Sequence, residues 1–300
     1  MTVPACPGVE VRVPASSANL GPGYDSFGLA LNRHDTVVAR RLESGGLVVG
    51  VSGVGAGVVP QSADHLVVRA AMTGFAALGE PVPGLDVKCA NNIPHGGGQG
   101  SSAAAIVAGL LVARGLTEDG VERLPEGDLL DLAARIEGHP DNVAAALLGG
   151  FTIAWMEGSG RAHAVRRRVH PEVRATIFTA SASSATVHAR GLLPLAVPHA
   201  DAAANVARAG LLVHALSDAP QLLFQATEDR LHQPYRAPAQ PATAALVSAL
   251  RAEGFAAIVS GAGPSVLVLG ASVPDDRWAV DGFTRTEVGI DPDGATVRPV

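Results

Sequence analysis

The sequence predicts an α+β protein of two domains. The chain has 300 residues, more than one minimal core needs and enough for two domains of ordinary size. Hydrophobic residues make up 47% of it and charged residues 17%, which is typical of folded globular proteins rather than disordered ones. Strand patterns and helix patterns are mixed along the whole length, and this favours helices packed on antiparallel sheets.

The chain begins with a strand that runs into a turn-rich loop. Val9, Val11 and Val13 alternate with polar residues, which is the period of a half-buried strand. We expect the residues after them, at 15–23, to form a loop that can hold a ligand. Further strand segments are predicted within 36–60 and at 85–90, with a helix at 64–78 between them.

The strongest local signal is a glycine-rich segment that opens a helix. Residues 96–100 contain four glycines and are followed by Ser101, Ser102 and an alanine-rich helical run. The first N–H groups of a helix and its positive dipole end bind phosphate, and glycines let the phosphate come close. We expect one serine to cap the helix and a serine hydroxyl to bind Mg²⁺. The simpler alternative is a tight turn before a core helix.

A break between two helices concentrates polar side chains. Helices are predicted at 126–137 and after the break up to residue 148, a strand follows at 151–156, and Gly138 and Pro140 interrupt the helical pattern. The polar residues around the break are Glu137, His139, Asp141 and Asn142. They offer a carboxylate that can bind a metal, an imidazole and two capping side chains. The alternative is helix capping by Asp141 beside a surface histidine.

The second half begins after a short polar segment at 157–160, which we interpret as a linker. This divides the chain into domains at 1–157 and 158–300. A strand is predicted at 174–180, helices at 202–216, 220–227 and 241–253, and a pair of strands around the glycine-containing segment at 260–265.

Two further groups of polar residues are candidates for binding a small ligand. Asn19 and Asp25 bracket a glycine-containing loop, so one loop can present an amide and a carboxylate, and Asp25 suits an ammonium group. Thr186 and Arg190 are four residues apart, and either Arg190 or Arg236 can bind a carboxylate or neutralise phosphate charge. The alternatives are turn formation for the first pair and surface ion pairs for the arginines.

Composition and charge exclude several classes of protein. The formal net charge is −6 and the arginines are scattered along the sequence, which argues against nucleic acid as a partner. The start lacks a signal-peptide pattern, and no apolar run approaches about 18 residues, so we expect a cytoplasmic protein with no membrane partner. Cys6 and Cys89 are far apart, which excludes a zinc cluster. Lys88 is the only lysine, so no Walker A loop is present.

One rival motif is formally present in the glycine-rich segment. Gly98, Gly100 and Ala103 fit the spacing of a dinucleotide-binding fingerprint. The fingerprint belongs directly after a strand, whereas residues 91–95 are predicted to be a loop, and no acidic residue ends a second strand. A dinucleotide-dependent oxidoreductase is therefore a distant alternative.

Read together, these segments resemble the GHMP small-molecule kinases, and among them the homoserine kinases most. The matching segments are 14–25, 93–104, 137–142, 186–190, 232–236 and 260–265. The resemblance spans nearly the whole chain. It implies a two-domain fold, with an N-terminal domain like domain 2 of ribosomal protein S5 and a ferredoxin-like C-terminal domain, and a ligand cleft between them.

The resemblance also implies the cofactors ATP and Mg²⁺, a hydroxy amino acid such as L-homoserine as substrate, and a possible homodimer. It places ATP at Pro94, His95, Gly96, Gly97, Gly98, Gln99, Gly100, Ser101, Ser102 and Ala103, and Mg²⁺ at Ser101, Ser102 and Glu137. It places the substrate at Asn19, Asp25, His139, Asn142, Thr186, Arg190, Arg236 and Gly261, with Gly263 also lining the cleft. The catalytic residues by this resemblance are His139, Asp141, Asn142, Arg190 and Arg236. Asp25 would bind the ammonium and the two arginines the carboxylate, while His139 or Asp141 would accept the hydroxyl proton.

The chain departs from the family pattern at one place. Homoserine kinases usually carry Arg-Gly-Leu-Gly before the paired serines, and this chain has Gly97-Gly98-Gln99-Gly100. A positive charge and an apolar side chain are missing, although the backbone N–H groups remain. This leaves two alternatives open: a related kinase with another substrate, and a weakened or non-catalytic binding protein.

Overall fold

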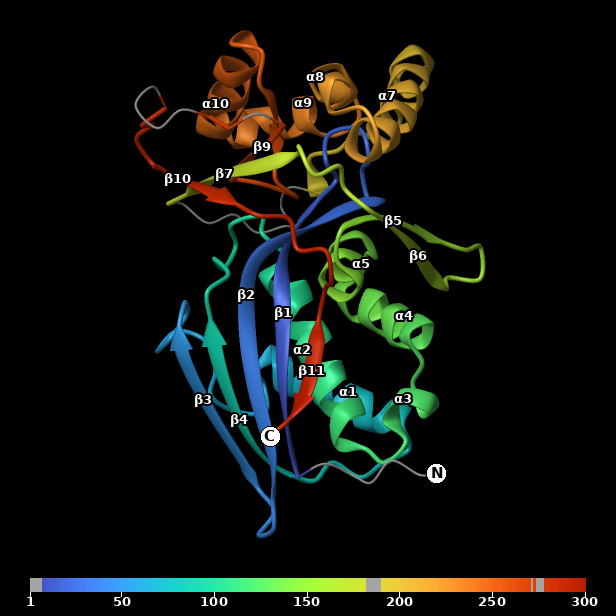
Figure 1. Cartoon of the computed structure of the whole chain (residues 1–300), viewed down its shortest axis with the longest axis vertical. Coiled ribbons are helices and arrows are strands. Elements are labelled where there is room, and N and C mark those ends of the chain that lie inside the picture. Colours follow the sequence, from blue (N-terminus) through green and yellow to red (C-terminus); the bar gives the residue numbers. More distant parts are fainter. Residues whose placement is uncertain (1–6, 182–189, 271, 274–277) are drawn as a thin grey trace.

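The structure is a computed structural model that describes residues 7–181, 190–270, 272–273 and 278–300 (Figure 1). It contains a seven-stranded sheet and a four-stranded sheet. In Figure 1 the larger sheet and helices α1 to α5 form the lower part of the molecule, and the smaller sheet with α7 to α10 forms the upper part. The predicted α+β class is confirmed.

The larger sheet has the strand order β11-β1-β2-β4-β3, and β5 and β6 extend it from β2. Its strands are β1 Gly8–Ala18, β2 Phe27–Leu42, β3 Leu47–Gly53, β4 Gly84–Asn91, β5 Phe151–Met156, β6 Ala162–Arg167 and β11 Thr296–Pro299. All pairings are antiparallel except that of β3 with β4, which are joined through a helix.

Five helices pack on this sheet and build the main core (Figure 1). They are α1 Leu66–Ala77, α2 Ser101–Leu116, α3 Gly120–Arg123, α4 Glu126–Glu137 and α5 Asp141–Leu148. Small residues let α1 and α2 approach closely, because a Cβ on Gly109 would lie 2.2 Å from the carbonyl oxygen of Val67. Leu110, Phe75 and Phe151 are fully buried, so α2 is held at the centre of the domain.

The smaller sheet is antiparallel, with the order β10-β7-β9-β8. Its strands are β7 Arg174–Ala180, β8 Ala256–Val259, β9 Val266–Gly270 and β10 Phe283–Val288. Numbered along the chain the order is 4-1-3-2, which is the ferredoxin-like arrangement. Between β7 and β8 lie α7 His199–Ser217, η1 Pro220–Leu222, α8 Leu223–Ala226, α9 Gln233–Arg236, η2 Ala237–Ala239 and α10 Pro241–Ala252.

Several predicted elements need correction. The helix at 126–137 and the strands at 151–156 and 174–180 are confirmed with the same bounds, and the helix that follows the break ends at Leu148 as predicted but already begins at Asp141. However, β1 continues to Ala18 through residues predicted to be a loop, because its pairing with β2 resumes after a register shift between Pro14 and Ala15. β2 likewise begins at Phe27, earlier than expected.

The segment predicted to be a linker is instead the turn between β5 and β6. The Glu157 N–H donates to the carbonyl oxygen of Arg161 over 2.8 Å, so the chain reverses here and stays in the larger sheet. Glycine and serine suit a tight turn as well as a linker, and the pattern does not distinguish them. The domain division 1–157 and 158–300 stays a prediction. Sheet membership favours a division after Arg167, with β11 returning to the first domain.

The end of the chain is fastened to the larger sheet by a buried hydrogen bond between His34 and Asp291. His34 Nε2 lies 2.7 Å from an Asp291 carboxylate oxygen, and the other oxygen of Asp291 accepts the N–H groups of Asp293 and Gly294. These contacts turn the chain toward β11, which then pairs with β1. In the parts of the chain that the structure describes, no helix is both long and apolar enough to span a bilayer.

Candidate active site

A cavity of about 280 Å³ lies where the two sheets meet. It is lined by Asn19, Asp25, Gly96, Gly98, Gln99, Gly100, Ser101, Ser102, Glu137, His139, Asp141, Asn142, Arg190, Arg236, Gly261 and Ala262. The segments that supply these residues are distant in the sequence: the loop after β1, the start of α2 with the loop before it, the break between α4 and α5, the segment before α7, helix α9, and the loop between β8 and β9. Most of the residues predicted to form the site are therefore brought together.

The glycine-rich loop is held against the C-terminal domain by close backbone contacts. Gly98 has φ +70°, and a Cβ there would lie 2.2 Å from the carbonyl oxygen of Ser260. The Ser260 hydroxyl lies 2.7 Å from the Gly98 carbonyl oxygen and 2.9 Å from the Ser17 hydroxyl. A carbonyl only accepts, so Ser260 donates to Gly98 and accepts from Ser17. One buried hydroxyl thus joins β1, the loop and the C-terminal domain.

Helix α2 begins at the cavity with two serines whose hydroxyls are not used as caps. Its N-cap is Gly100, with φ +68° and no side-chain cap. The prediction that Ser101 or Ser102 caps the helix is therefore wrong, because both already lie inside the first turn. Gly100 is required here, since a Cβ would lie 2.0 Å from the Ser16 hydroxyl oxygen. The first N–H groups of α2 and both serines are left to face the cavity.

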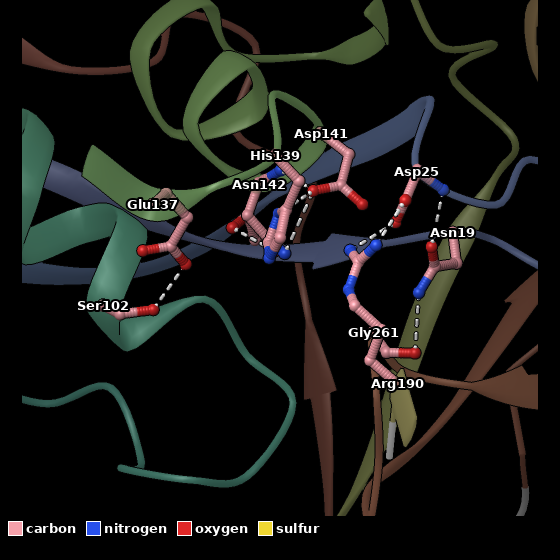
Figure 2. Close-up of polar contacts among 10 residues, drawn as sticks. Asn19, Asp25, Ser102, Glu137, His139, Asp141, Asn142, Arg190 and Gly261 are labelled. Atoms are coloured by element: carbon pink, nitrogen blue, oxygen red, sulfur yellow. Dashed lines mark hydrogen bonds and ion pairs between the residues drawn. The ribbon is translucent and has the colours of Figure 1, made fainter. Parts of the chain in front are cut away.

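One end of the cavity carries hard oxygen donors. The Ser102 hydroxyl donates to Glu137 over 2.6 Å (Figure 2). Burial raises the pKa of Glu137, although Ser102 and the nearby His139 oppose that rise. No group of three or more His, Cys, Asp or Glu residues suited to a metal occurs in the described part of the chain. Two oxygens fit an ion that takes its remaining ligands from phosphates and water, as Mg²⁺ does.

The break between α4 and α5 places His139 and Asp141 beside these oxygens (Figure 2). His139 Nδ1 lies 2.8 Å from Asp141 Oδ1, which also accepts the Asn142 N–H over 2.7 Å. Burial disfavours the charged imidazole, but the hydrogen bond and negative charge of Asp141 outweigh it and raise the pKa of His139. The predicted capping by Asp141 is also wrong in detail, since Asp141 is the first helical residue.

The other end of the cavity carries an ion pair. Arg190 donates two hydrogen bonds to Asp25, each of 2.8 Å, in a bidentate arrangement (Figure 2). Asn19 orients this loop, because its side chain accepts the Asp25 N–H and donates to the carbonyl oxygen of Gly261. Asp25 was predicted to bind the ammonium group of a substrate and Arg190 its carboxylate. In this structure the two side chains pair with each other.

Tyr24 is a residue of this end that sequence reasoning did not single out. The centre of its ring is 5.7 Å from the guanidinium carbon of Arg190, 5.3 Å from that of Arg236 and 5.4 Å from the ring centre of His232. Burial, followed by the charge of Asp25, raises the pKa of Tyr24. The sequence signal that could have identified Tyr24 is its position directly before Asp25 in a glycine-containing loop.

Some predicted site residues lie elsewhere. Pro94, Gly97, Ala103 and Gly263 do not line the cavity, and Thr186 lies outside the described residues. His95 lines a neighbouring cavity of about 260 Å³ that shares Ser101 and Ser102 with the first. The serines therefore stand at the point where the two cavities meet.

The expectation that the arginines are scattered is wrong in three dimensions. Arg166, Arg167, Arg168 and Arg174 line a separate cavity of about 500 Å³ next to β6 and β7. The bend between β6 and β7 brings Arg174 close to the three consecutive arginines at 166–168. A further cavity of about 510 Å³ lies behind Arg236 and is lined mainly by α9, α10 and the segment before α9. Neither contains the glycine loop or Glu137, so the chemistry belongs to the smaller cavity.

Comparison with known proteins agrees with this geometry. The family model described as "GHMP kinases N terminal domain" matches residues 65–150, and "GHMP kinases C terminal" matches residues 202–276. The curated homoserine kinase of Streptomyces coelicolor is 52% identical over 97% of this chain and 95% of its own length. The chain belongs to the GHMP kinase family. It is accordingly an ATP-dependent phosphotransferase, and the two-domain fold that the resemblance implied is confirmed.

Other relatives and solved structures are similar to this kinase over nearly its whole length. The homoserine kinase of Clavibacter michiganensis subsp. michiganensis is 50% identical over 97% of this chain and 94% of its own length. The crystal structure of homoserine kinase from Cytophaga hutchinsonii superposes with a TM-score of 0.82 at 26% identity, covering 97% of this chain and 98% of that one. L. major mevalonate kinase, at 13% identity and a TM-score of 0.65, shares the fold alone.

The dinucleotide alternative does not fit the topology. β4, the strand before the glycine loop, pairs antiparallel with β2 and parallel with β3 at its other edge. A dinucleotide fingerprint needs a paired parallel strand-helix-strand unit starting at that loop, whereas α2 is followed by further helices and by β5, which pairs with β2 and β6.

We predict that Gly100→Ala disrupts nucleotide binding. The substitution adds a Cβ at φ +68°, 2.0 Å from Ser16, and strains the backbone by roughly 1–2 kcal/mol before the clash is counted. Affinity for Mg·ATP should fall at least about tenfold by calorimetric titration. Gly97→Ala is the matched control, since a Cβ there would be 3.3 Å from its nearest neighbour. Equal affinities for the two variants would contradict the prediction.

A second prediction concerns the protonation of His139. In Asp141→Asn the hydrogen bond and charge that raise the pKa are weakened while burial remains, so the pKa of His139 should fall. In the native protein the raised pKa stabilises the fold fully below about pH 6.5, and this contribution is lost as the pH rises through the folded pKa. The midpoint is measured from the imidazole C–H resonance, assigned with His139→Gln. An unchanged midpoint would argue against control by Asp141.

Proposed function

We propose that this GHMP kinase transfers the γ-phosphoryl group of ATP to the hydroxyl of L-homoserine, making O-phospho-L-homoserine for threonine biosynthesis. The main observation in support is the arrangement of polar side chains along the cavity. Ser102 and Glu137 lie at one end, Asp25 and Arg190 at the other, and His139 and Asp141 between them (Figure 2). Relatives named homoserine kinase that are about half identical over nearly the whole chain support the same reaction.

The nucleotide is proposed to occupy the end formed by the glycine loop. Backbone N–H groups at the start of α2 suit the phosphates, and Ser102 with Glu137 would hold Mg²⁺, which neutralises phosphate charge when bound. The neighbouring cavity that contains His95 shares both serines and is partly apolar, with Val59 and His65 in its wall. It therefore suits the adenine ring of a nucleotide whose phosphates lie at the two serines.

The amino acid is proposed to occupy the opposite end. Its ammonium group would contact Asp25 and its carboxylate would contact Arg190 and Arg236, replacing the Asp25–Arg190 ion pair. Arg190 is 44% exposed and Asp25 is 33% exposed, so their mutual pairing contributes only about 0–1 kcal/mol and is readily exchanged for a zwitterion. Asn19 and Tyr24 keep the loop and the arginines in place.

The substrate hydroxyl would then point toward the middle of the cavity. A carbon chain one methylene longer than that of serine extends the hydroxyl away from the charged end. Phosphoryl transfer depends chiefly on alignment and charge stabilisation, so one acceptor for the hydroxyl proton suffices. With Asp141 bound to its Nδ1, His139 has Nε2 left as that acceptor when the imidazole is neutral. A cytoplasmic location and a homodimer stay predictions.

The test is ADP release from Mg·ATP with L-homoserine, L-threonine, L-serine and mevalonate as separate acceptors. We expect turnover with L-homoserine at least about 100-fold above the others in kcat/KM, since a hydroxyl misplaced by one methylene loses alignment. Turnover of another acceptor, or none of the four despite nucleotide binding, would replace this proposal with a related kinase of different substrate. Failure to bind nucleotide would favour a weakened or non-catalytic homologue.

Glu137→Gln should reduce Mg·ATP-dependent turnover by at least about 100-fold, because an uncharged amide oxygen binds Mg²⁺ more weakly than a carboxylate does. The side chain keeps its size and can still accept from Ser102, so the thermal midpoint should shift little. Glu126→Gln is the matched control, since Glu126 is exposed at the start of the same helix. Turnover of the Glu137 variant equal to the control would remove Glu137 from the metal site.

A further inference from the structure

Gln99 stands where the family pattern has leucine, and its side chain is not solvent-exposed. It is 1% exposed, deep in the loop that precedes α2. A buried amide costs free energy unless its donor and acceptor atoms are both paired. The hydrogen-bond partners of the Gln99 amide therefore indicate what this residue does in this chain.

The amide of Gln99 joins the two sheets. Its Oε1 accepts from Arg33 of β2 over 2.8 Å, and its Nε2 donates to the Thr179 hydroxyl of β7 over 2.9 Å. Arginine has only donors, so the amide orientation is fixed by Arg33. The backbone of Gln99 is held as well, because its carbonyl oxygen accepts the Ser16 N–H over 3.1 Å.

Arg33 depends on this contact. Its guanidinium is half-buried, and burial lowers its pKa. Among the described residues no carboxylate pairs with it, and Gln99 is its hydrogen-bond partner. A leucine at position 99 would leave the charge without an acceptor and Thr179 without its donor, while filling a similar volume.

We propose that Gln99 is a positioning residue for nucleotide binding. Through Arg33 and Thr179 it ties the glycine loop to both sheets, and so it holds the loop's N–H groups where the phosphates bind. The proposal rests on the proposed kinase function. It explains why this chain has glutamine where the family pattern has leucine: a polar bridge holds the shape of the loop in place of an apolar side chain.

The experiment measures Mg·ATP affinity by calorimetric titration without acceptor, together with the KM for L-homoserine. Gln99→Leu and Arg33→Met should each weaken Mg·ATP binding about tenfold, because the first leaves the half-buried Arg33 and Thr179 without their amide partner and the second leaves the buried Gln99 oxygen unpaired. The double variant should lose less affinity than the sum of the two single losses, because the unpaired Arg33 charge and the unpaired Gln99 oxygen are both gone while Thr179 still lacks its donor. The homoserine KM should stay within about twofold, since the bridge lies at the phosphate end.

Matched variants separate positioning from general destabilisation. Thr179→Val should weaken Mg·ATP binding, whereas Thr179→Ser keeps the hydroxyl and should not. Gln221→Leu, at an exposed glutamine, should bind as the native protein does. Native affinity in Gln99→Leu, strictly additive losses in the double variant, or a larger change in the homoserine KM than in Mg·ATP affinity would overturn the proposal. Because titration needs no acceptor, failure of homoserine as substrate is seen separately.

Discussion

The site depends on the approach of the glycine loop to the backbone of both domains. At Gly98 and Gly100 the chain has left-handed backbone conformations, and a Cβ at either position would lie within 2.2 Å of an oxygen atom. Only glycine meets both conditions. The approach lets Ser260 bridge Gly98 and Ser17, and it fixes where α2 begins. Without it the serines, Glu137 and the substrate end would not share one cavity.

The electrostatics of the cavity differ between its two ends because burial differs. At the end that contains Ser102, burial raises the pKa of Glu137, so a cation beside it would favour the ionised carboxylate. In the middle, Asp141 outweighs burial and holds the pKa of His139 up. At the opposite end the Asp25–Arg190 pair is partly exposed, so the mutual attraction of its charges contributes little.

The departure from the family pattern shows how one loop shape can be held by different chemistry. An apolar side chain would fill the space beneath the loop by packing alone. Gln99 fills it with an amide whose two ends are both satisfied, by Arg33 and Thr179. Such a network is directional, so it specifies the relation of the loop to both sheets more narrowly than packing does, and it tolerates the loss of one member poorly.

The sequence by itself determined the elements with strong local signals. Helix α4 and strands β5 and β7 were predicted with their observed bounds because their apolar periodicity, glycines and prolines act over a few residues. The ordered motifs also predicted most of the cavity's lining. Tertiary structure decided the rest. The extension of β1 and the Gln99 bridge depend on partners distant in the chain, while the turn at 157–160 and the approach of Arg174 to Arg166–Arg168 depend on which strands pair on either side. A local pattern records what a residue favours, whereas its contacts are set by which strands pair and which backbones approach.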